Sequence, residues 1–357
     1  MKTKLDKKNN KDKEDIATID FNEKSVCAVI VTYNRKHLLI KCLKALLSQS
    51  RPLQAIYIMD NASTDGTAEA LLENKFINAI PPASLDAPWE ISCRNSISQS
   101  LDGYNDMSVL IYYVKMHINM GGAGGFHEGV KRSFEKGFDW MWLMDDDGIP
   151  EKDCLYQLLF EGKTHKADFL APLVIDINHS GKLSFGIFDY KNNQTIYTFQ
   201  DAKKYSYDGI FEGTACLFNG ILISKELVKI VGYPKKEMFI WGDEIEYLSR
   251  IKSKGLKVIT ICNAIHRHPI GNINYYKIFF GKFWIRFNDH RLRDYCKFRN
   301  MAFIYKNYAM NKLLKDVAKY SWFFIITRKF DIKNLLFYLS ATIDGLRADF
   351  SKHRKYL

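Results

Sequence analysis

Runs of apolar residues separated by polar stretches divide the first half of the chain into strands and helices. Unbroken apolar runs, typical of strands buried on both faces of a parallel sheet, predict strands at residues 26–31, 55–59, 109–114 and 140–144. Apolar residues at helical spacing predict helices at 38–47, at 67–73 and from the glycine-rich stretch 119–125 to about residue 136. Prolines and polar residues predict an irregular insertion over 74–107. Strands that alternate with helices in this order predict an α/β fold with a parallel sheet.

The second half of the chain has a mixed pattern. It predicts strands at 169–175, 182–188 and 214–223, a helix at 240–254 and a closing strand at 257–261. After about residue 275 we expect no strands, only helices with apolar and aromatic faces. The lysine-rich residues 1–24 have too few apolar groups to fold and are expected to be a disordered leader. We therefore predict a catalytic domain at 25–270 and a helical region at 271–357.

Composition excludes several classes of protein. With 357 residues, 47% of them hydrophobic and 26% charged, the chain is neither collagen-like, nor a coiled coil, nor wholly disordered. The seven cysteines are scattered without a close pair, which indicates neither a disulfide framework nor a zinc site and fits a reducing cytosol. No apolar segment follows the start and no run reaches the length of a membrane span, so we expect a cytoplasmic protein.

The net charge of +12 is concentrated at one end of the chain. Residues 271–357 carry 18 Lys and Arg against 6 Asp and Glu, and they hold 21 of the 50 aromatic residues. One interpretation is peripheral docking on the anionic inner face of the cell membrane, with the aromatic segment 322–326 in the headgroup region. The alternative is a helical unit that packs on the catalytic domain or on a second copy, which gives a homo-oligomer. A nucleic-acid partner is not expected, because no RRM, KH or zinc-finger pattern accompanies the basic residues.

Polar residues follow the four predicted strands of the first half. In an open α/β sheet, ligands bind beyond the carboxyl ends of the strands. The segments that follow these strands are Thr32-Tyr33-Asn34-Arg35, Asp60-Asn61, the stretch Asn119-Met120-Gly121-Gly122-Ala123-Gly124-Gly125-Phe126, and Asp145-Asp146-Asp147. We therefore expect these four loops to meet at one crevice.

The three consecutive aspartates are candidate metal ligands. Adjacent carboxylates repel one another unless a cation neutralises them, and in an extended segment Asp145 and Asp147 project to the same side. Oxygen ligands suit Mg²⁺ or Mn²⁺. His266 and His268, at alternate positions after the closing strand, offer a further ligand. Taken alone, the aspartates equally fit a solvated acidic turn.

Two other groups of residues are candidates for contact with a substrate. Glycines let a backbone approach a phosphate or sugar closely, although the order here is not a dinucleotide-binding motif. Asp243 and Glu244 stand at the start of a predicted helix, where acidic residues commonly only compensate the helix dipole. The functional alternative is a general base for an acceptor hydroxyl, with Trp241 as a platform for a sugar face.

Together these motifs resemble the family 2 inverting glycosyltransferases of the GT-A fold. The resemblance covers about residues 25–270 and rests on the order and spacing of TYNR (32–35), DNASTDGT (60–67), the DDD after an apolar strand and a later acidic pair. DNASTDGT is the most specific of these motifs. Within the family, NMGGAGGF (119–126), WLMDDD (142–147) and WGDEIEY (241–247) are most similar to the bacterial galactofuranosyltransferases, which use UDP-galactofuranose. Rhamnosyltransferases that use dTDP-rhamnose are close relatives, so a rhamnosyltransferase is the alternative function. A further alternative is an inactive member of the family that acts as a scaffold.

The resemblance implies a role for each motif. Thr32, Tyr33, Asn34 and Arg35, with Asp60 and Asn61, would hold the uridine; Asn119, Gly121, Gly122, Gly124 and Gly125 would pass beside the diphosphate and donor sugar, near Asp145 and Asp146. Asp145 and Asp147 would coordinate Mn²⁺ or Mg²⁺, with His266 as the first choice of further ligand and His268 as the second. Asp243 or Glu244 would be the base, and the acceptor would be a lipid-linked saccharide of a cell-surface polysaccharide.

Overall fold

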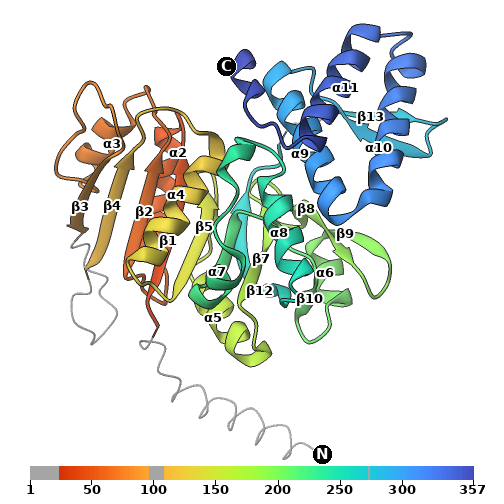
Figure 1. Cartoon of the computed structure of the whole chain (residues 1–357). Helices are drawn as coiled ribbons and strands as arrows, with labels where there is room; N and C mark the ends of the chain where they lie inside the picture. Colours follow the sequence, from red (N-terminus) through yellow and green to blue (C-terminus); the bar gives the residue numbers. More distant parts are fainter. Residues whose placement is uncertain (1–23, 96–107, 272–273) are drawn as a thin grey trace, which may run out of the picture.

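The computed structural model describes residues 24–95, 108–271 and 274–357 (Figure 1). The predicted leader therefore lies outside the described residues, apart from Lys24. The described part of the chain forms a 12-stranded sheet whose main path has the order β10-β12-β7-β11-β5-β1-β2-β4-β3, and a separate hairpin, β13-β14. The mixed α/β architecture matches the prediction.

The first half of the chain supplies one side of the sheet and its helices. Its strands are β1 (Val26–Thr32), β2 (Ala55–Asp60), β3 (Trp89–Asn95), β4 (Val109–Lys115), β5 (Trp140–Asp145) and β6 (Ile149–Pro150). Its helices are α2 (Lys36–Leu47), α3 (Thr67–Glu73) and α4 (Gly121–Glu135). β1 pairs in parallel with both β2 and β5, and β2 pairs in parallel with β4. The carboxyl ends of these four strands therefore lie at the same edge of the sheet.

The second half adds antiparallel pairings. Its strands are β7 (Phe169–Asp176), β8 (Lys182–Asp189), β9 (Gln194–Thr198), β10 (Ile210–Glu212), β11 (Asn219–Ser224) and β12 (Val258–His268), and its helices are α5 (Cys154–His165), α6 (Phe199–Tyr205), α7 (Lys225–Val231) and α8 (Asp243–Ser253). β11 is inserted between β5 and β7 and runs antiparallel to both. β12 pairs in parallel with β7.

The two faces of the sheet carry separate hydrophobic cores. Alternate residues of β1 enter opposite cores, because successive side chains of a strand point to opposite faces. Val26, Ala28 and Ile30 pack in the core that includes α2, α3 and α5. Cys27, Val29 and Val31 pack in the core that includes α4, α7 and α8. Burial on both faces explains why the central strands have unbroken apolar runs.

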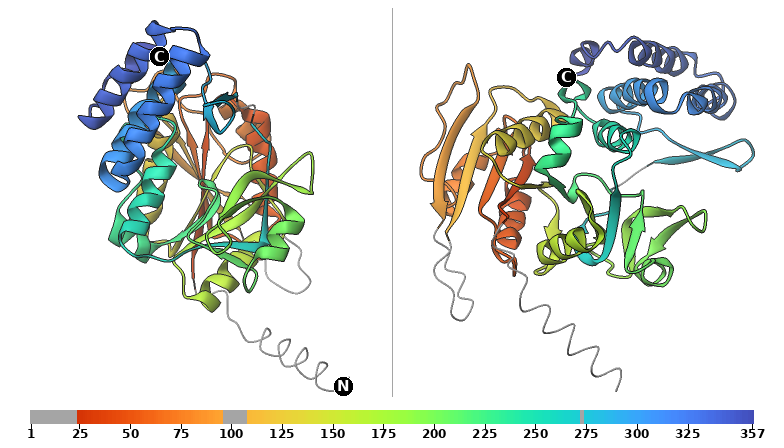
Figure 2. Two further views of the ribbon diagram at one scale, coloured as in Figure 1. Left: turned by 90° about the vertical axis from the view of Figure 1, so that its right-hand side faces the viewer. Right: turned by 60° about the horizontal axis from the view of Figure 1, so that its bottom comes forward.

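Residues 275–357 form a hairpin and three α-helices, with shorter helical segments at Phe323–Thr327 and Lys352–Tyr356 (Figures 1 and 2). The elements are β13 (Tyr275–Ile278), β14 (Phe283–Arg286), α9 (Arg291–Tyr308), α10 (Met310–Trp322) and α11 (Ile332–Leu346). Their aromatic residues form a core of their own, which also takes in Phe239. Within the described residues, no helix combines the length and the apolar character that a membrane crossing requires.

Several expected elements differ from the structure. Residues 89–95 of the expected insertion form the edge strand β3, whose alternating exposure hides it from a search for apolar runs. The strand expected at 214–223 begins only at Asn219, and the helix expected from 240 begins at Asp243. The closing strand continues to His268, past a register shift between Ile261 and Ile265. The expectation of helices alone after residue 275 was wrong, because aromatic residues around Gly281 form the β13-β14 hairpin. The boundary at 270 stays an interpretation.

Candidate functional site

The aspartate cluster lies at the carboxyl end of β5, beside the end of β1. Thr32 Oγ1 donates a hydrogen bond to Asp146 at 2.7 Å. Arg35 Nη1 donates to Asp146 at 3.2 Å and to Asp147 at 2.9 Å. The parallel pairing of β1 with β5 brings these residues together, so two of the four expected loops meet here. Arg35 supplies positive charge to an otherwise acidic cluster.

The three aspartates have different electrostatic surroundings. Burial, and then the charges of Asp147 and Asp146, raise the pKa of Asp145 to about 8. Burial also raises the pKa of Asp146 to about 6, against the hydrogen bond from Thr32 and the charge of Arg35. For Asp147 burial is outweighed by the hydrogen bond and charge of His268 and by Arg35, so its pKa lies below the ordinary value. Asp145 is thus the carboxyl of the cluster that keeps its proton most readily when no cation is bound, and Asp147 is the one that loses it most readily.

The two candidate histidines lie inside β12. His268 Nε2 is 3.1 Å from Asp147 Oδ1, and its Nδ1 is 2.6 Å from the Pro269 carbonyl. His266 is fully buried, and burial lowers its pKa to about 3. A Cβ on Gly148 or Gly220 would lie within 3 Å of the His266 ring, so both positions require glycine. The histidine that the structure places against an aspartate is therefore His268, the second choice from the sequence.

The chemistry of this donor set fits a divalent cation. Carboxylate oxygens with an imidazole nitrogen are ligands that Mn²⁺ and Mg²⁺ accept. The pKa of Asp145 is raised partly by repulsion from Asp147 and Asp146, and a bound cation would offset that repulsion. Among the described residues, however, no three acidic, histidine or cysteine side chains are grouped so as to hold an ion, and Arg35 contacts two of the aspartates. Metal binding thus stays a prediction for these residues.

Two of the uridine-binding candidates, Asp60 and Asn34, make hydrogen bonds within the protein. Asp60 is fully buried and accepts hydrogen bonds from Tyr113 at 2.6 Å, Lys115 at 3.1 Å and the Ser63 amide at 2.7 Å. Asn34, at a φ of 53°, links to the loop after β2 by accepting from the Thr64 amide.

Asn61 ties the loop after β2 to the glycine-rich segment. Its amide nitrogen donates to the Gly121 carbonyl at 2.7 Å, and its Oδ1 accepts from the Met120 amide at 2.9 Å. Asn119 Oδ1 accepts from the Gly121 amide at 2.8 Å. Tyr33 is exposed beside these loops. The structure thus joins three of the predicted segments, while their contacts with a donor stay a prediction.

The glycines lie in the first turns of α4, where packing explains most of them. A Cβ on Gly125 would lie 2.5 Å from the Val31 side chain, and one on Gly121, at a φ of 70°, would lie 2.1 Å from the Phe239 carbonyl. A Cβ on Gly124 would meet Met120 of its own turn. Gly122 faces open space and is the glycine best placed to let a ligand approach the backbone.

The loop before α8 is strained and is held from two sides. Phe239, Trp241 and Gly242 have φ values of 66°, 64° and 95°, a region that costs energy for the two aromatic residues. On one side, the Ala123 amide of α4 donates to the Phe239 carbonyl at 3.0 Å. The other side is held by Asn300 of α9.

Asn300 is fully buried and bonds to three carbonyls of this loop. Its Nδ2 donates to Met238 at 3.0 Å, Ile240 at 3.1 Å and Trp241 at 2.5 Å. Arg299, also fully buried, donates to the Met238 carbonyl at 2.8 Å and to Asn300 Oδ1 at 2.9 Å. The sequence analysis missed both residues; a signal was available, since they form a polar pair within an otherwise apolar and aromatic stretch of α9.

The acidic pair at the start of α8 is asymmetric. Asp243 is buried, and burial together with the neighbouring charge and hydrogen bond of Glu244 raises its pKa well above the ordinary value. Asp145 is among the other charges that raise it, which indicates that the acidic pair lies near the aspartate cluster. Glu244 is only half-buried, and its Oε2 accepts a hydrogen bond from the Gly242 amide at 2.9 Å. Glu244 is therefore the member of the pair that suits proton removal.

Trp241 does not offer a free ring face on both sides. The guanidinium of Arg286, from β14, lies 3.7 Å from the centroid of its ring. Glu244 is one of the charges that favour the charged form of Arg286, although burial lowers the pKa of Arg286 overall. Arg286 thus lies beside the acidic pair and, like Arg299, was not predicted from the sequence.

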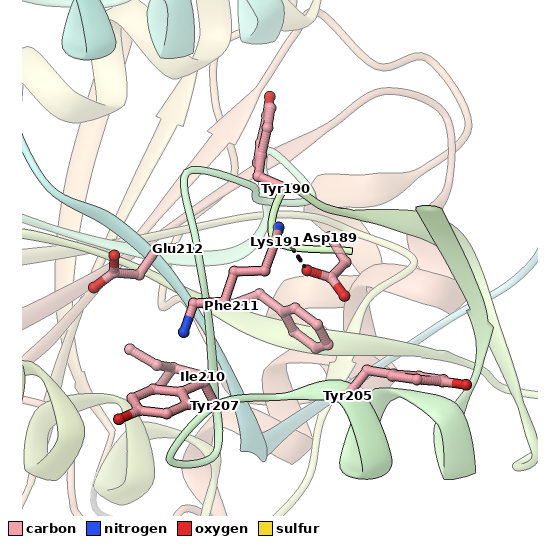
Figure 3. Close-up of a pocket in the computed structure, with 8 residues that line it drawn as sticks. All are labelled: Asp189, Tyr190, Lys191, Tyr205, Tyr207, Ile210, Phe211 and Glu212. Carbon is pink, nitrogen blue, oxygen red and sulfur yellow. Dashed lines mark hydrogen bonds between the residues drawn. The ribbon is translucent and has the colours of Figure 1, made fainter. Parts of the chain in front are cut away.

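A separate cavity of about 320 Å³ lies between the turn after β8, the end of α6 and β10 (Figure 3). Tyrosines 190, 205 and 207 line it together with Lys191, whose Nζ lies 3.6 Å from the centroid of the Tyr207 ring. None of the candidate catalytic or donor residues lines this cavity.

Comparison with known proteins identifies the family. Residues 27–78 and 92–219, half of the chain, match the family model described as glycosyl transferase family 2. The chain belongs to this family. It is a glycosyltransferase, which confirms the family expected from the motifs.

Its relatives are galactofuranosyltransferases. The chain is 28% identical over 310 residues to galactofuranosyltransferase GlfT1 of Mycolicibacterium smegmatis, which covers 85% of this chain and 91% of that protein. It is 27% identical over 332 residues to GlfT1 of Mycobacterium tuberculosis, which covers 92% of this chain and 97% of that protein.

A solved structure agrees on the fold. The structure of S. aureus TarS 1-349 matches with a TM-score of 0.50 at 12% identity, over 93% of this chain and 90% of that one. The GT-A fold expected from the sequence is thereby confirmed.

Proposed function

We propose that this glycosyltransferase moves galactofuranose from UDP-galactofuranose to a hydroxyl of a lipid-linked glycan, with inversion at the anomeric carbon. The proposal is supported by two acidic centres, the Asp145–Asp147 cluster at the end of β5 and the Asp243-Glu244 pair at the start of α8. The glycine-rich start of α4 bonds to the loop before α8, from the Ala123 amide to the Phe239 carbonyl at 3.0 Å, and Asp145 is one of the charges that raise the pKa of Asp243. One centre suits a nucleotide diphosphate, and the other suits an acceptor hydroxyl.

Each centre has its own part in a single displacement. Asp145, Asp147 and His268 would hold a divalent cation, which when bound supplies positive charge to the diphosphate leaving group. Glu244 accepts the proton of the acceptor hydroxyl while that oxygen forms a bond to the anomeric carbon. The bond from that carbon to the diphosphate breaks with its electron pair on the diphosphate. Protonated Asp243 donates a hydrogen bond to Glu244 and orients it.

Galactofuranose is proposed because the relatives that cover most of the chain are named galactofuranosyltransferases. We propose a cytoplasmic protein at the inner face of the membrane, where a lipid-linked acceptor is available. Association of copies through the C-terminal helices stays a prediction, as does the absence of a nucleic-acid partner.

The donor is tested by supplying UDP-galactofuranose, UDP-galactopyranose and dTDP-rhamnose in turn, with Mn²⁺ and a lipid-linked saccharide. We expect UDP release from UDP-galactofuranose to exceed release from its pyranose isomer by about a hundredfold, because ring shape decides which hydroxyls the site can bond. Faster consumption of dTDP-rhamnose would instead support the rhamnosyltransferase alternative.

The hydrogen bonds from Asn300 to the loop before α8 give a further prediction. Asn300→Ala should lower kcat by about 10- to 100-fold while the affinity for UDP changes less than twofold, because small displacements of positioned groups are costly and Asn300 bonds to the loop before α8 rather than to a donor-binding candidate. The control is Asn307→Ala on the same helix, whose exposed amide donates to the Phe303 carbonyl at 2.7 Å. Calorimetric UDP binding and steady-state kinetics measure both. A parallel loss of UDP affinity and kcat would show a general loss of structure instead.

A further inference from the structure

The tip of the β13-β14 hairpin exposes aromatic rings that the fold does not need. Phe280 is 95% exposed, and Trp284 and Phe283 are 54% and 47% exposed. Phe279 and Phe280 have φ values of 48° and 56°, a turn conformation that favours glycine or asparagine. Neither burial nor backbone preference therefore explains a phenylalanine at position 280. In contrast, Phe323 and Phe324, in the segment 322–326 first expected to contact lipid, are fully buried, whereas Ile326 of the same segment is 53% exposed, so the two phenylalanines themselves do not face lipid.

Basic residues surround these rings. Lys277 Nζ lies 5.0 Å from the centroid of the Trp284 ring, and Lys319 Nζ of α10 lies 5.1 Å from that of Phe283. Between Asn274 and Asn288 the sequence contains no acidic residue. The nearest carboxylate on α10, Asp316, is half-buried and accepts a hydrogen bond from Tyr338 at 3.2 Å. Lys319 is close enough to Asp316 for its charge to lower the pKa of that carboxyl, so the positive charge without an acidic residue on its own hairpin is that of Lys277 and Lys282.

The tip and the end of α10 form one continuous surface. Phe279 stacks on Trp322 with ring centroids 4.4 Å apart, and Phe280 lies edge-on to the same ring at 5.9 Å. The hairpin projects away from the body of the protein (Figure 2). The tip, supported by Trp322, thus lies at the periphery of the described structure beside the C-terminal helices.

We propose that this tip, formed by Phe280, Phe283 and Trp284 with Lys277, Lys282 and Lys319, docks on an anionic lipid leaflet. Aromatic rings are stable at the boundary between headgroups and acyl chains, and lysines beside them are attracted to anionic headgroups. Charge complementarity with no acidic residue on the hairpin favours a lipid surface over a second copy of this chain, because the same patch on two copies would bring like charges together.

The hairpin also connects this surface to the proposed acceptor site, a step that rests on the proposed function. β14 runs from Phe283 at the tip to Arg286, whose guanidinium lies on the Trp241 ring. At a rise of roughly 3.3 Å per residue, these two positions are about 10 Å apart along the strand. A saccharide carried on a membrane lipid would therefore reach Trp241 and Glu244 along β14.

Flotation of the full chain with vesicles tests the docking. The vesicles contain phosphatidylcholine alone or phosphatidylcholine with phosphatidylglycerol. We expect the wild-type protein to float only with the anionic vesicles. The double variant F280S/W284S should partition about a hundredfold less, at about tenfold per ring, because each ring contributes roughly 1.5 kcal/mol when buried. Lys277→Gln with Lys282→Gln should weaken binding and reduce its dependence on salt. The matched control is Tyr197→Ser, which removes a ring of 64% exposure on β9.

The outcomes separate docking from catalysis. F280S/W284S should keep wild-type circular dichroism and wild-type turnover of a water-soluble acceptor, and lose turnover of an acceptor embedded in anionic vesicles. Wild-type protein that stays with the unbound fraction, or a double variant that floats like the wild type, would overturn the proposal. So would sedimentation that shows a wild-type dimer converted to a monomer by F280S/W284S. If the wild type transfers sugar to neither acceptor, the proposed function fails, and flotation alone still decides whether the tip binds lipid.

Discussion

Replacement of Glu244 by glutamine is expected to lower kcat about a thousandfold, the middle of the range that a positioned general base contributes. Glutamine keeps the shape of the side chain and an oxygen for the Gly242 amide, which donates to Glu244 Oε2 at 2.9 Å, but it cannot accept the proton of the acceptor hydroxyl. UDP affinity should not change, because the donor-binding candidates lie after β1, β2, β4 and β5 and Glu244 is not one of them. Steady-state kinetics with a water-soluble acceptor and calorimetric UDP binding measure the two effects.

Asp243→Asn is the matched control for this prediction. Burial and the neighbouring Glu244 raise the pKa of Asp243 well above its ordinary value, so Asp243 is the member of the pair that favours the protonated form. Asparagine resembles that form and can donate a hydrogen bond to Glu244. We therefore expect kcat to fall less than tenfold. If Asp243→Asn instead abolishes turnover while Glu244→Gln retains it, the base is Asp243.

Buried parallel strands account for the part of the site that the sequence could predict. The apolar runs of β1, β2 and β5 stop where polar residues begin, so the sequence shows where each strand ends. Parallel strands bring those ends to one edge of the sheet. Thr32, Arg35 and the aspartates were placed together for this reason, and the contacts of Asp146 with Thr32 and Arg35 agree. Local pattern and sheet direction sufficed here because each strand is buried on both faces.

Other parts of the site depend on contacts that no local pattern contains. Asn300 reaches the loop before α8 across about 60 positions of sequence, and its partners are backbone carbonyls, which carry no side-chain signal. Arg286 lies on the hairpin, where half-exposed aromatic residues do not show a strand pattern. His268 could not be separated from His266 because residues two apart in a strand share a face, so only the tertiary contact of His268 Nε2 with Asp147 Oδ1 at 3.1 Å distinguishes them.

Replacement of Asp147 by asparagine is expected to lower kcat about a thousandfold and to remove most of the Mn²⁺-dependent gain in UDP affinity. Asp147 is the aspartate that contacts both Arg35, at 2.9 Å, and His268, at 3.1 Å, and its pKa is held below the ordinary value despite burial, by His268 and Arg35. Asparagine has nearly the same volume but no charge, so the cluster loses the carboxylate best able to attract a cation. A loss of several kcal/mol in stabilisation of the leaving group corresponds to about three orders of magnitude in rate.

Asp153→Asn is the control for Asp147, since Asp153 is exposed and makes no side-chain capping bond at the start of α5. It should leave both kcat and the effect of Mn²⁺ on UDP binding unchanged. Calorimetry of UDP with and without Mn²⁺ reports on the site independently of turnover, and thermal melting shows whether each variant is folded. A folded Asp147→Asn protein whose UDP affinity still rises with Mn²⁺ as in the wild type would exclude Asp147 as a ligand. The charge in the cluster would then have to be neutralised by Arg35, which already bonds to Asp146 and Asp147, and the leaving diphosphate would be stabilised by side chains alone.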